Sequence, residues 1–273
     1  MTNTKFIEVA PGVELSVQDA GSGEVLVLIP GWMFGTDVFA QQVDYFSRTH
    51  RVIAIDPRSQ GKSTVSLQGN DYVTHGQDLE KVIEVLDLKN VTLLGWSFGC
   101  LTVWEYVRQF GLENVKRAVF VDLSPKPLST DHENDWVEGP LDDIAGAYTS
   151  ALRNPAGQRA FITEYATEVM VQRELETDEL EWIVGQSLNT PYYVAANLFA
   201  AGMFSDYREE ATLVNSTIPV LTVAAEHWGE TARAFMERVA PGSQVEVFGG
   251  HLMFWEHSGK FNELVESFLK NNT

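Results

Sequence analysis

Short apolar runs recur along the chain and alternate with segments of helical periodicity. These runs are rich in β-branched residues and nearly free of polar ones: Val25–Ile29, Arg51–Ile55, Val91–Leu94, Ala118–Val121, Val220–Ala224 and Val245–Phe248. Runs that are apolar on both faces are typical of strands in a parallel sheet with helices on either side. The pattern therefore predicts an α/β protein with a mostly parallel central sheet.

The segments between these runs, and the end of the chain, have the spacing of amphipathic helices. In the final segment apolar residues repeat at i, i+3, i+4, i+7 and i+8: Phe261, Leu264, Val265, Phe268 and Leu269. At the other end of the chain, Lys5–Val9 and Leu15–Asp19 flank Pro11-Gly12 and predict a β-hairpin that precedes the parallel strands.

The segment from about residue 125 to residue 215 breaks this alternation. It has no convincing strand pattern, but it has helical stretches with many aromatic residues. We predict an α/β core of residues 1–124 and 216–273, with residues 125–215 forming a helical lid over a site. Trp136 and Trp182 lie in this segment and are expected to contact a small, largely apolar substrate.

Composition narrows the classes of function. The 273 residues carry a formal net charge of −19, which argues against a nucleic-acid partner because phosphate binding needs a basic surface. Cys100 is the single cysteine, and no histidine pair has metal-ligand spacing, so we expect neither a metal nor an organic cofactor. No run has the length of a membrane span, and we expect a cytoplasmic monomer or homodimer acting on a small molecule.

One pentapeptide has the pattern of a turn that presents a reactive serine. Gly95-Trp96-Ser97-Phe98-Gly99 reads G-x-S-x-G, directly after an apolar run and before the helix-like Leu101–Phe110. A sharp strand-to-helix turn exposes the serine hydroxyl, and the residues on either side have no room for a Cβ atom. At the start of the helix, the N–H of Phe98 is free to bind an oxyanion. Ser97 is therefore a candidate nucleophile.

With these motifs the chain resembles the α/β-hydrolase fold superfamily over essentially its whole length. The resemblance implies a sheet of about eight strands with flanking helices and a lid. It also implies a second oxyanion donor in the loop "IPGWMFG", where Pro30 replaces the usual histidine. Because that donor is a backbone N–H, Trp32 remains the candidate. The family's catalytic histidine corresponds to His251 in "FGGHLMFWE". Four other histidines lack such a context and are expected to face solvent: His50, His75, His132 and His257.

The third member of the triad is less clearly marked. Most relatives have an acid after the seventh strand in a G-x-x-D pattern, but Trp228 occupies that place here. The alternative position in the family is the end of the sixth strand, which holds Asp122. Glu226 is the rival, and we favour Asp122.

These residues indicate a serine hydrolase that cleaves a carboxylic ester, thioester or lactone through an acyl-enzyme. A narrower resemblance, in "LIPGWMFG" and "VFVDLSPKP", links the chain to the cofactor-free quinolone dioxygenases, in which a His/Asp pair deprotonates a hydroxylated heteroaromatic ring. Those enzymes have a histidine where this chain has Phe34, which we expect to line the substrate pocket. Dioxygenation stays the alternative, and a non-enzymatic ligand receptor on the same fold is a third class.

Overall fold

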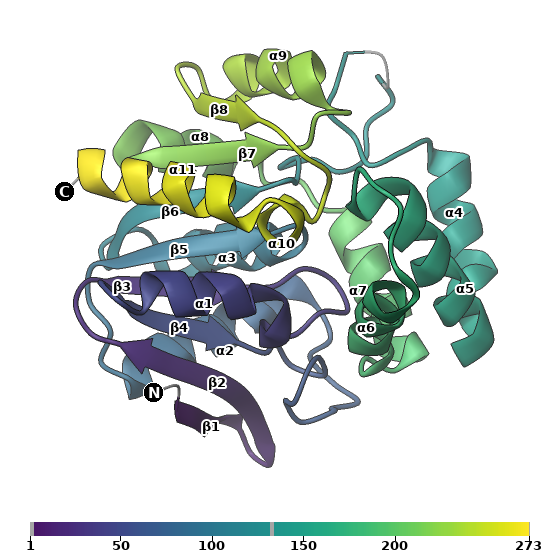
Figure 1. Ribbon diagram of the computed structural model, residues 1–273, viewed down its shortest axis with the longest axis horizontal. Coiled ribbons are helices and arrows are strands. Elements are labelled where there is room, and N and C mark those ends of the chain that lie inside the picture. The colour runs from purple at the N-terminus through teal and green to yellow at the C-terminus, as the bar shows by residue number, and fades with distance from the viewer. Residues whose placement is uncertain (1–2, 132–133, 273) are drawn as a thin grey trace.

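The computed structural model describes residues 3–131 and 134–272, and an eight-stranded sheet runs through its centre (Figure 1). The strands lie in the order β1-β2-β4-β3-β5-β6-β7-β8. Both pairings of β2 are antiparallel, and all other pairings are parallel. This confirms the predicted mostly parallel sheet. The strand bounds are β1 (Asn3–Ala10), β2 (Val13–Gly21), β3 (Val25–Ile29), β4 (Arg51–Ile55), β5 (Val91–Trp96), β6 (Val115–Val121), β7 (Val220–Ala224) and β8 (Gln244–Val247).

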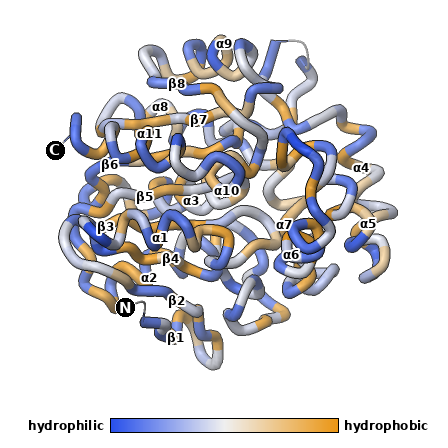
Figure 2. The backbone as a smooth tube through the Cα atoms, viewed as in Figure 1, coloured by the Kyte–Doolittle hydropathy of each residue, from blue (hydrophilic) through white to orange (hydrophobic). Residues whose placement is uncertain are grey.

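Helices cover both faces of the sheet, which explains why its strands are apolar on both sides. Alternate residues of β3 enter two different hydrophobic clusters: Val27 packs on the side of α2 and α3, and Leu28 packs on the side of α1 and α11. Figure 2 shows hydrophobic positions concentrated along these strands. The helices of the two layers are α1 (Ala40–Phe46), α10 (Met253–Glu256) and α11 (Ser258–Asn271) on one face, and α2 (Tyr72–Val85), α3 (Gly99–Phe110) and α8 (Arg208–Thr217) on the other.

A helical insertion, residues 125–207, separates β6 from α8. In Figure 1 its α4, α5, α6 and α7 gather at the right, beyond the carboxyl ends of the parallel strands. Its described part contains no strand, as the sequence predicts. The helix after it, α8, packs on α3, where Arg108 Nε donates to Glu210 Oε1 over 2.7 Å. The elements of the insertion are α4 (Leu141–Thr149), η2 (Ala151–Arg153), α5 (Pro155–Tyr165), the π-helical turn η3 (Ala166–Met170), α6 (Thr177–Leu188) and α7 (Tyr192–Met203).

Two elements remain to be placed, a 3-10 turn before α1 and a helix between β7 and β8. The 3-10 turn η1 (Thr36–Phe39) leads into α1, and α9 (Gly229–Val239) lies beside β7 and β8 (Figure 1). Within residues 3–131 and 134–272, no helix combines the length and the apolar character that crossing a membrane requires.

Candidate active site

Ser97 occupies a sharp turn between β5 and α3. Its φ of 52° lies in the left-handed region, which a residue with a Cβ atom adopts only at a cost. Two backbone hydrogen bonds fix this turn: Ser97 N donates to Val121 O over 2.7 Å, and Cys100 N donates to Ser97 O over 2.8 Å. The serine therefore projects from the carboxyl edge of the sheet.

Three glycines make room for this turn. A Cβ atom on Gly95 would come within 2.7 Å of Cys100 N, and one on Gly99 would overlap the carbonyl oxygen of Ile29. Both contacts are shorter than real Cβ contacts, as the G-x-S-x-G pattern predicts. Gly31 has the same constraint, since its Cβ would lie 2.8 Å from Ser97 Cβ. Sequence reasoning did not identify this role for Gly31.

His251 follows β8 and is held by Asp122, which follows β6. His251 Nδ1 lies 2.6 Å from Asp122 Oδ2, and both side chains are almost completely buried. The second oxygen, Asp122 Oδ1, accepts a hydrogen bond from Ala225 N over 2.7 Å. A carboxylate at Nδ1 favours the tautomer that keeps its proton there and leaves Nε2 free to accept one.

The main chain around His251 is also fixed, on one side by the sheet and on the other by the helical insertion. Trp96 Nε1 donates to His251 O over 2.8 Å. Two carbonyl groups of η3 accept bonds from the histidine segment: Val169 O from His251 N over 3.3 Å and Met170 O from Leu252 N over 2.7 Å. The position of the imidazole thus depends on the insertion as well as on the core.

The rival acid, Glu226, lies away from the imidazole. Its side chain is exposed, and Glu226 Oε2 accepts a hydrogen bond from Gln172 Nε2 over 2.8 Å. This bond holds the pKa of the Glu226 carboxyl below its usual range. In the described structure the carboxylate that contacts His251 is Asp122.

An apolar cavity of about 320 Å³ lies in front of Ser97 and His251. Its wall combines the residues of the serine turn with aromatic side chains of the insertion, and Phe34 belongs to it, as expected from the sequence. Among the described residues, Ser97 Oγ and His251 share no hydrogen bond, although both line this cavity. In unliganded proteins such bonds are often long and shorten when a substrate binds. The other aromatic lining residues include Trp32, Trp96, Phe98, Phe161 and Phe199.

The two residues whose backbone N–H groups are candidates to bind an oxyanion, Trp32 and Phe98, line the same cavity. Neither Trp32 N nor Phe98 N donates a hydrogen bond to another described residue. The indole of Trp32 is fixed separately, because its Nε1 donates to Ala195 O over 2.8 Å. Two free N–H groups beside a serine hydroxyl can stabilise negative charge that develops on a carbonyl oxygen.

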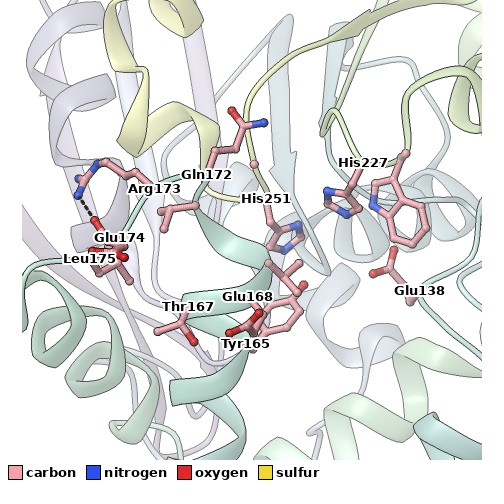
Figure 3. A pocket seen from close by; sticks show the side chains of 14 residues that line it. Glu138, Tyr165, Thr167, Glu168, Gln172, Arg173, Glu174, Leu175, His227 and His251 are labelled. Atoms are coloured by element: carbon pink, nitrogen blue, oxygen red, sulfur yellow. Dashed lines mark hydrogen bonds between the residues drawn. The ribbon is translucent and has the colours of Figure 1, made fainter.

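A larger and more open cavity of about 1040 Å³ also borders His251 (Figure 3). Four residues line both cavities: Glu138, Tyr165, Val169 and His251. Glu138 and Tyr165 were not identified from the sequence, because nothing in their local pattern marks them as facing a site.

Two expected substrate contacts are placed elsewhere. Trp136 is fully buried in a cluster with Phe235 and Met236 of α9. Trp182 stacks on Trp255 with ring centroids 5.8 Å apart. Neither side chain lines the apolar cavity, so the aromatic content of the insertion reflects packing at these positions.

The remaining histidines differ in their surroundings. His257 is exposed and His50 is partly exposed, whereas His132 lies outside the described residues. The expectation that His75 faces solvent is wrong. His75 is buried, and burial lowers its pKa to about 4. Among residues 3–131 and 134–272, no three His, Cys, Asp or Glu side chains cluster as metal ligands would.

Comparisons with known proteins agree with this architecture. Residues 24–162 match a family model described as alpha/beta hydrolase fold. A Synechocystis sp. protein with the provisional name non-heme chloroperoxidase is 28% identical, over 94% of this chain and 95% of its own length. An esterase from Exiguobacterium antarcticum superposes with a TM-score of 0.85 at 26% identity, covering 97% of this chain and 99% of that one. A bromoperoxidase from Bacillus anthracis superposes with a TM-score of 0.88 at 23% identity, covering 98% of this chain and 100% of that one.

Proposed function

Because the chain belongs to the alpha/beta hydrolase fold family, we propose that it hydrolyses carboxylic esters, thioesters or lactones with largely apolar acyl groups. The observation that carries this proposal is the serine turn and the Asp122–His251 pair facing one apolar cavity. The similarity to an esterase supports the same reaction class.

In the proposed reaction Ser97 is the nucleophile. His251 Nε2 removes the proton from Ser97 Oγ, which attacks the carbonyl carbon of the ester. Asp122 keeps the imidazole in the required tautomer and stabilises the imidazolium that forms. The carbonyl oxygen, now negative, binds the N–H groups of Trp32 and Phe98, and one such donor typically contributes about 10²–10³ in rate.

Collapse of this intermediate breaks the bond to the alcohol, which takes the proton from His251. A water molecule, activated by the same imidazole, then attacks the acyl-enzyme and releases the acid. Because the apolar cavity is lined mainly by apolar side chains, many of them aromatic, burial of the acyl group supplies most of the binding free energy.

A panel of p-nitrophenyl esters of increasing chain length tests this proposal. Rapid mixing should show a burst of p-nitrophenol equal to the enzyme concentration, and mass spectrometry of the quenched enzyme should find the acyl group on Ser97. An acyl group on another residue, or no turnover of any ester, would contradict the proposal. Oxygen uptake with a 3-hydroxy-4-quinolone, measured in parallel, would instead support the dioxygenase alternative.

A second candidate activity follows from the peroxidase name of the Synechocystis relative. Hydrogen peroxide can replace water as the group that attacks an acyl-enzyme, and the product is then a peroxycarboxylic acid. This reaction would use the same Ser97 and His251. Formation of peracid from an ester and hydrogen peroxide, lost in Ser97→Ala, would support it, and hydrolysis without any peracid would exclude it.

A further inference from the structure

Glu138 places a carboxyl group where the two cavities meet. It lies in the loop between β6 and α4, and its N–H donates to Pro127 O over 2.8 Å, which fixes the main chain. It lines the apolar cavity with Ser97 and the open cavity with His227, and it shares both with His251. Figure 3 shows the side chains of Glu138, His227 and His251 around the open cavity.

One oxygen of this carboxyl group has no partner. Glu138 Oε1 is closed off from solvent and makes no hydrogen bond with any described residue. A buried polar atom without a partner is costly, so folded proteins rarely keep one unless a ligand or another group satisfies it. The residue as a whole is half-buried and lines both cavities, so a small rotation of the carboxyl group would turn this oxygen toward a bound substrate.

The protonation state decides which bond the carboxyl can make. Burial, together with the negative charge of Asp122, raises the pKa of Glu138 to about 8. At neutral pH the group is therefore mainly a neutral acid, which can donate a hydrogen bond to an oxygen acceptor.

The orientation of an ester indicates which part of the substrate Glu138 meets. The Trp32 and Phe98 amides, which would hold the carbonyl oxygen, border only the apolar cavity. The leaving oxygen must approach His251, which returns the proton to it, and His251 borders both cavities. The alcohol portion therefore points toward the shared wall that contains Glu138, while the acyl group fills the apolar cavity.

We propose that Glu138 binds the alcohol portion of the substrate by donating a hydrogen bond to an oxygen atom beyond the scissile bond, and so selects esters of oxygenated alcohols over esters of plain alkyl alcohols. This inference rests on the proposed ester hydrolysis at Ser97. The oxygen acceptor is an ether, hydroxyl or carbonyl group a few bonds from the ester.

Other ionisable groups line the two cavities with Glu138 or act on its charge, and the experiment must separate their titration from its own. They are Asp122 after β6, Asp143 on α4, Tyr165 on α5, Glu168 on η3, Arg173 and Glu174 after η3, His227 after β7 and His251 after β8. A ratio of rates for two esters cancels any group that affects both equally, His251 above all.

Methoxyethyl butyrate and butyl butyrate form a suitable pair, because they differ only by an ether oxygen in place of a methylene group. At pH 7 the wild-type kcat/KM should favour the methoxyethyl ester by about three- to tenfold, the range of one net hydrogen bond. Glu138→Leu should lower this preference to the intrinsic reactivity ratio of the two esters, measured by their alkaline hydrolysis. Glu138→Gln should keep it, because the amide also donates. The wild-type preference should fall as the pH rises through about 8, whereas that of Glu138→Gln should not.

Glu164→Leu and Glu164→Gln are matched controls, since Glu164 is exposed on α5 and lines neither cavity. Equal ratios in the wild type and Glu138→Leu, with both esters hydrolysed, would overturn this inference and leave the proposed function intact. A wild-type preference for the cationic dimethylaminoethyl butyrate over butyl butyrate, lost in Glu138→Gln, would also overturn this inference. That result would mean that Glu138 binds the substrate as an ionised carboxylate. If the wild type hydrolyses neither ester and Ser97 is not acylated, the proposed function fails and the inference fails with it.

Discussion

Asp122 Oδ2 and His251 Nδ1 are 2.6 Å apart, although the two residues are separated by 129 positions along the chain. They approach from either side of β7, because Asp122 follows β6 and His251 follows β8. The end of β7 supports the carboxylate through Ala225 N, 2.7 Å from Asp122 Oδ1. An acid after β6 thus reaches the imidazole that, in most relatives, an acid after β7 reaches.

Replacement of the two candidate acids should separate their roles. Asp122→Asn keeps the shape but favours the wrong histidine tautomer, so we expect kcat to fall at least ~10³-fold while the protein stays folded. Glu226→Gln should change kcat less than ~10-fold, because Glu226 contacts Gln172 and not His251. Steady-state kinetics with circular dichroism as a folding control measures both. The reverse ranking would assign the acid to Glu226.

Ser97→Ala should remove the nucleophile without disturbing the fold. We expect ester turnover to fall by several orders of magnitude and a fluorophosphonate probe to label the wild type only. In-gel fluorescence after probe treatment measures the labelling. Labelling of the alanine variant at wild-type intensity would show that another residue reacts.

Aromatic residues of the insertion should divide into cavity residues and packing residues. Phe199→Ala removes a ring that lines the apolar cavity, so the preference among p-nitrophenyl esters should shift toward longer acyl chains. Trp136→Ala removes a ring buried under α9, so unfolding should cost about 3–5 kcal/mol less and chain-length preference should stay unchanged. Urea titrations and the ester panel measure both effects, and an exchange of these two outcomes would contradict the assignment.

Gly31 should tolerate no side chain. In Gly31→Ala the new Cβ atom would lie 2.8 Å from Ser97 Cβ, so the serine turn must shift and kcat/KM should fall by at least ~10²-fold, the loss that a misplacement of about 1 Å can cause. Gly185→Ala on α6 is the control, since its Cβ would meet nothing within 4 Å. Activity of Gly31→Ala close to that of the control would refute the constraint.

His75 should make stability depend on pH. Burial lowers its folded pKa from 6.5 to about 4, so the unfolded chain takes up the proton first as the pH falls. The free energy of unfolding is unaffected by this group above pH 6.5 and falls as the pH drops from 6.5 to about 4. At pH 5 the loss amounts to roughly 2 kcal/mol. Urea midpoints at pH 7 and pH 5 should therefore differ less in His75→Leu than in the wild type. An equal difference would show that His75 is not the titrating group.

Most of the sheet is predictable from the sequence because strands covered on both faces must be apolar on both faces. The runs at Val25–Ile29, Arg51–Ile55 and Val220–Ala224 coincide with strands residue for residue. The turn at Ser97 is predictable for a different reason. Only glycine fits at positions 95 and 99, so the two glycines in the sequence indicate the tight turn directly.

Long-range packing is the part that local patterns do not contain. Trp136 and Phe199 are both aromatic residues in the same insertion, yet one packs under α9 and the other lines the apolar cavity. Their distinction depends on how the insertion folds back on the sheet. Glu138 is a similar case, since an acidic residue before a glycine and a proline is typical of an exposed loop.

The hydrogen bonds from His251 N and Leu252 N to η3 couple the covering helices to the imidazole. If the insertion moved away from the core as a unit, both bonds would break, and His251 would keep its contacts with Asp122 and Trp96 but lose those with η3. The helical insertion and the segment around His251 are therefore expected to lose their order together, in one cooperative step of local unfolding.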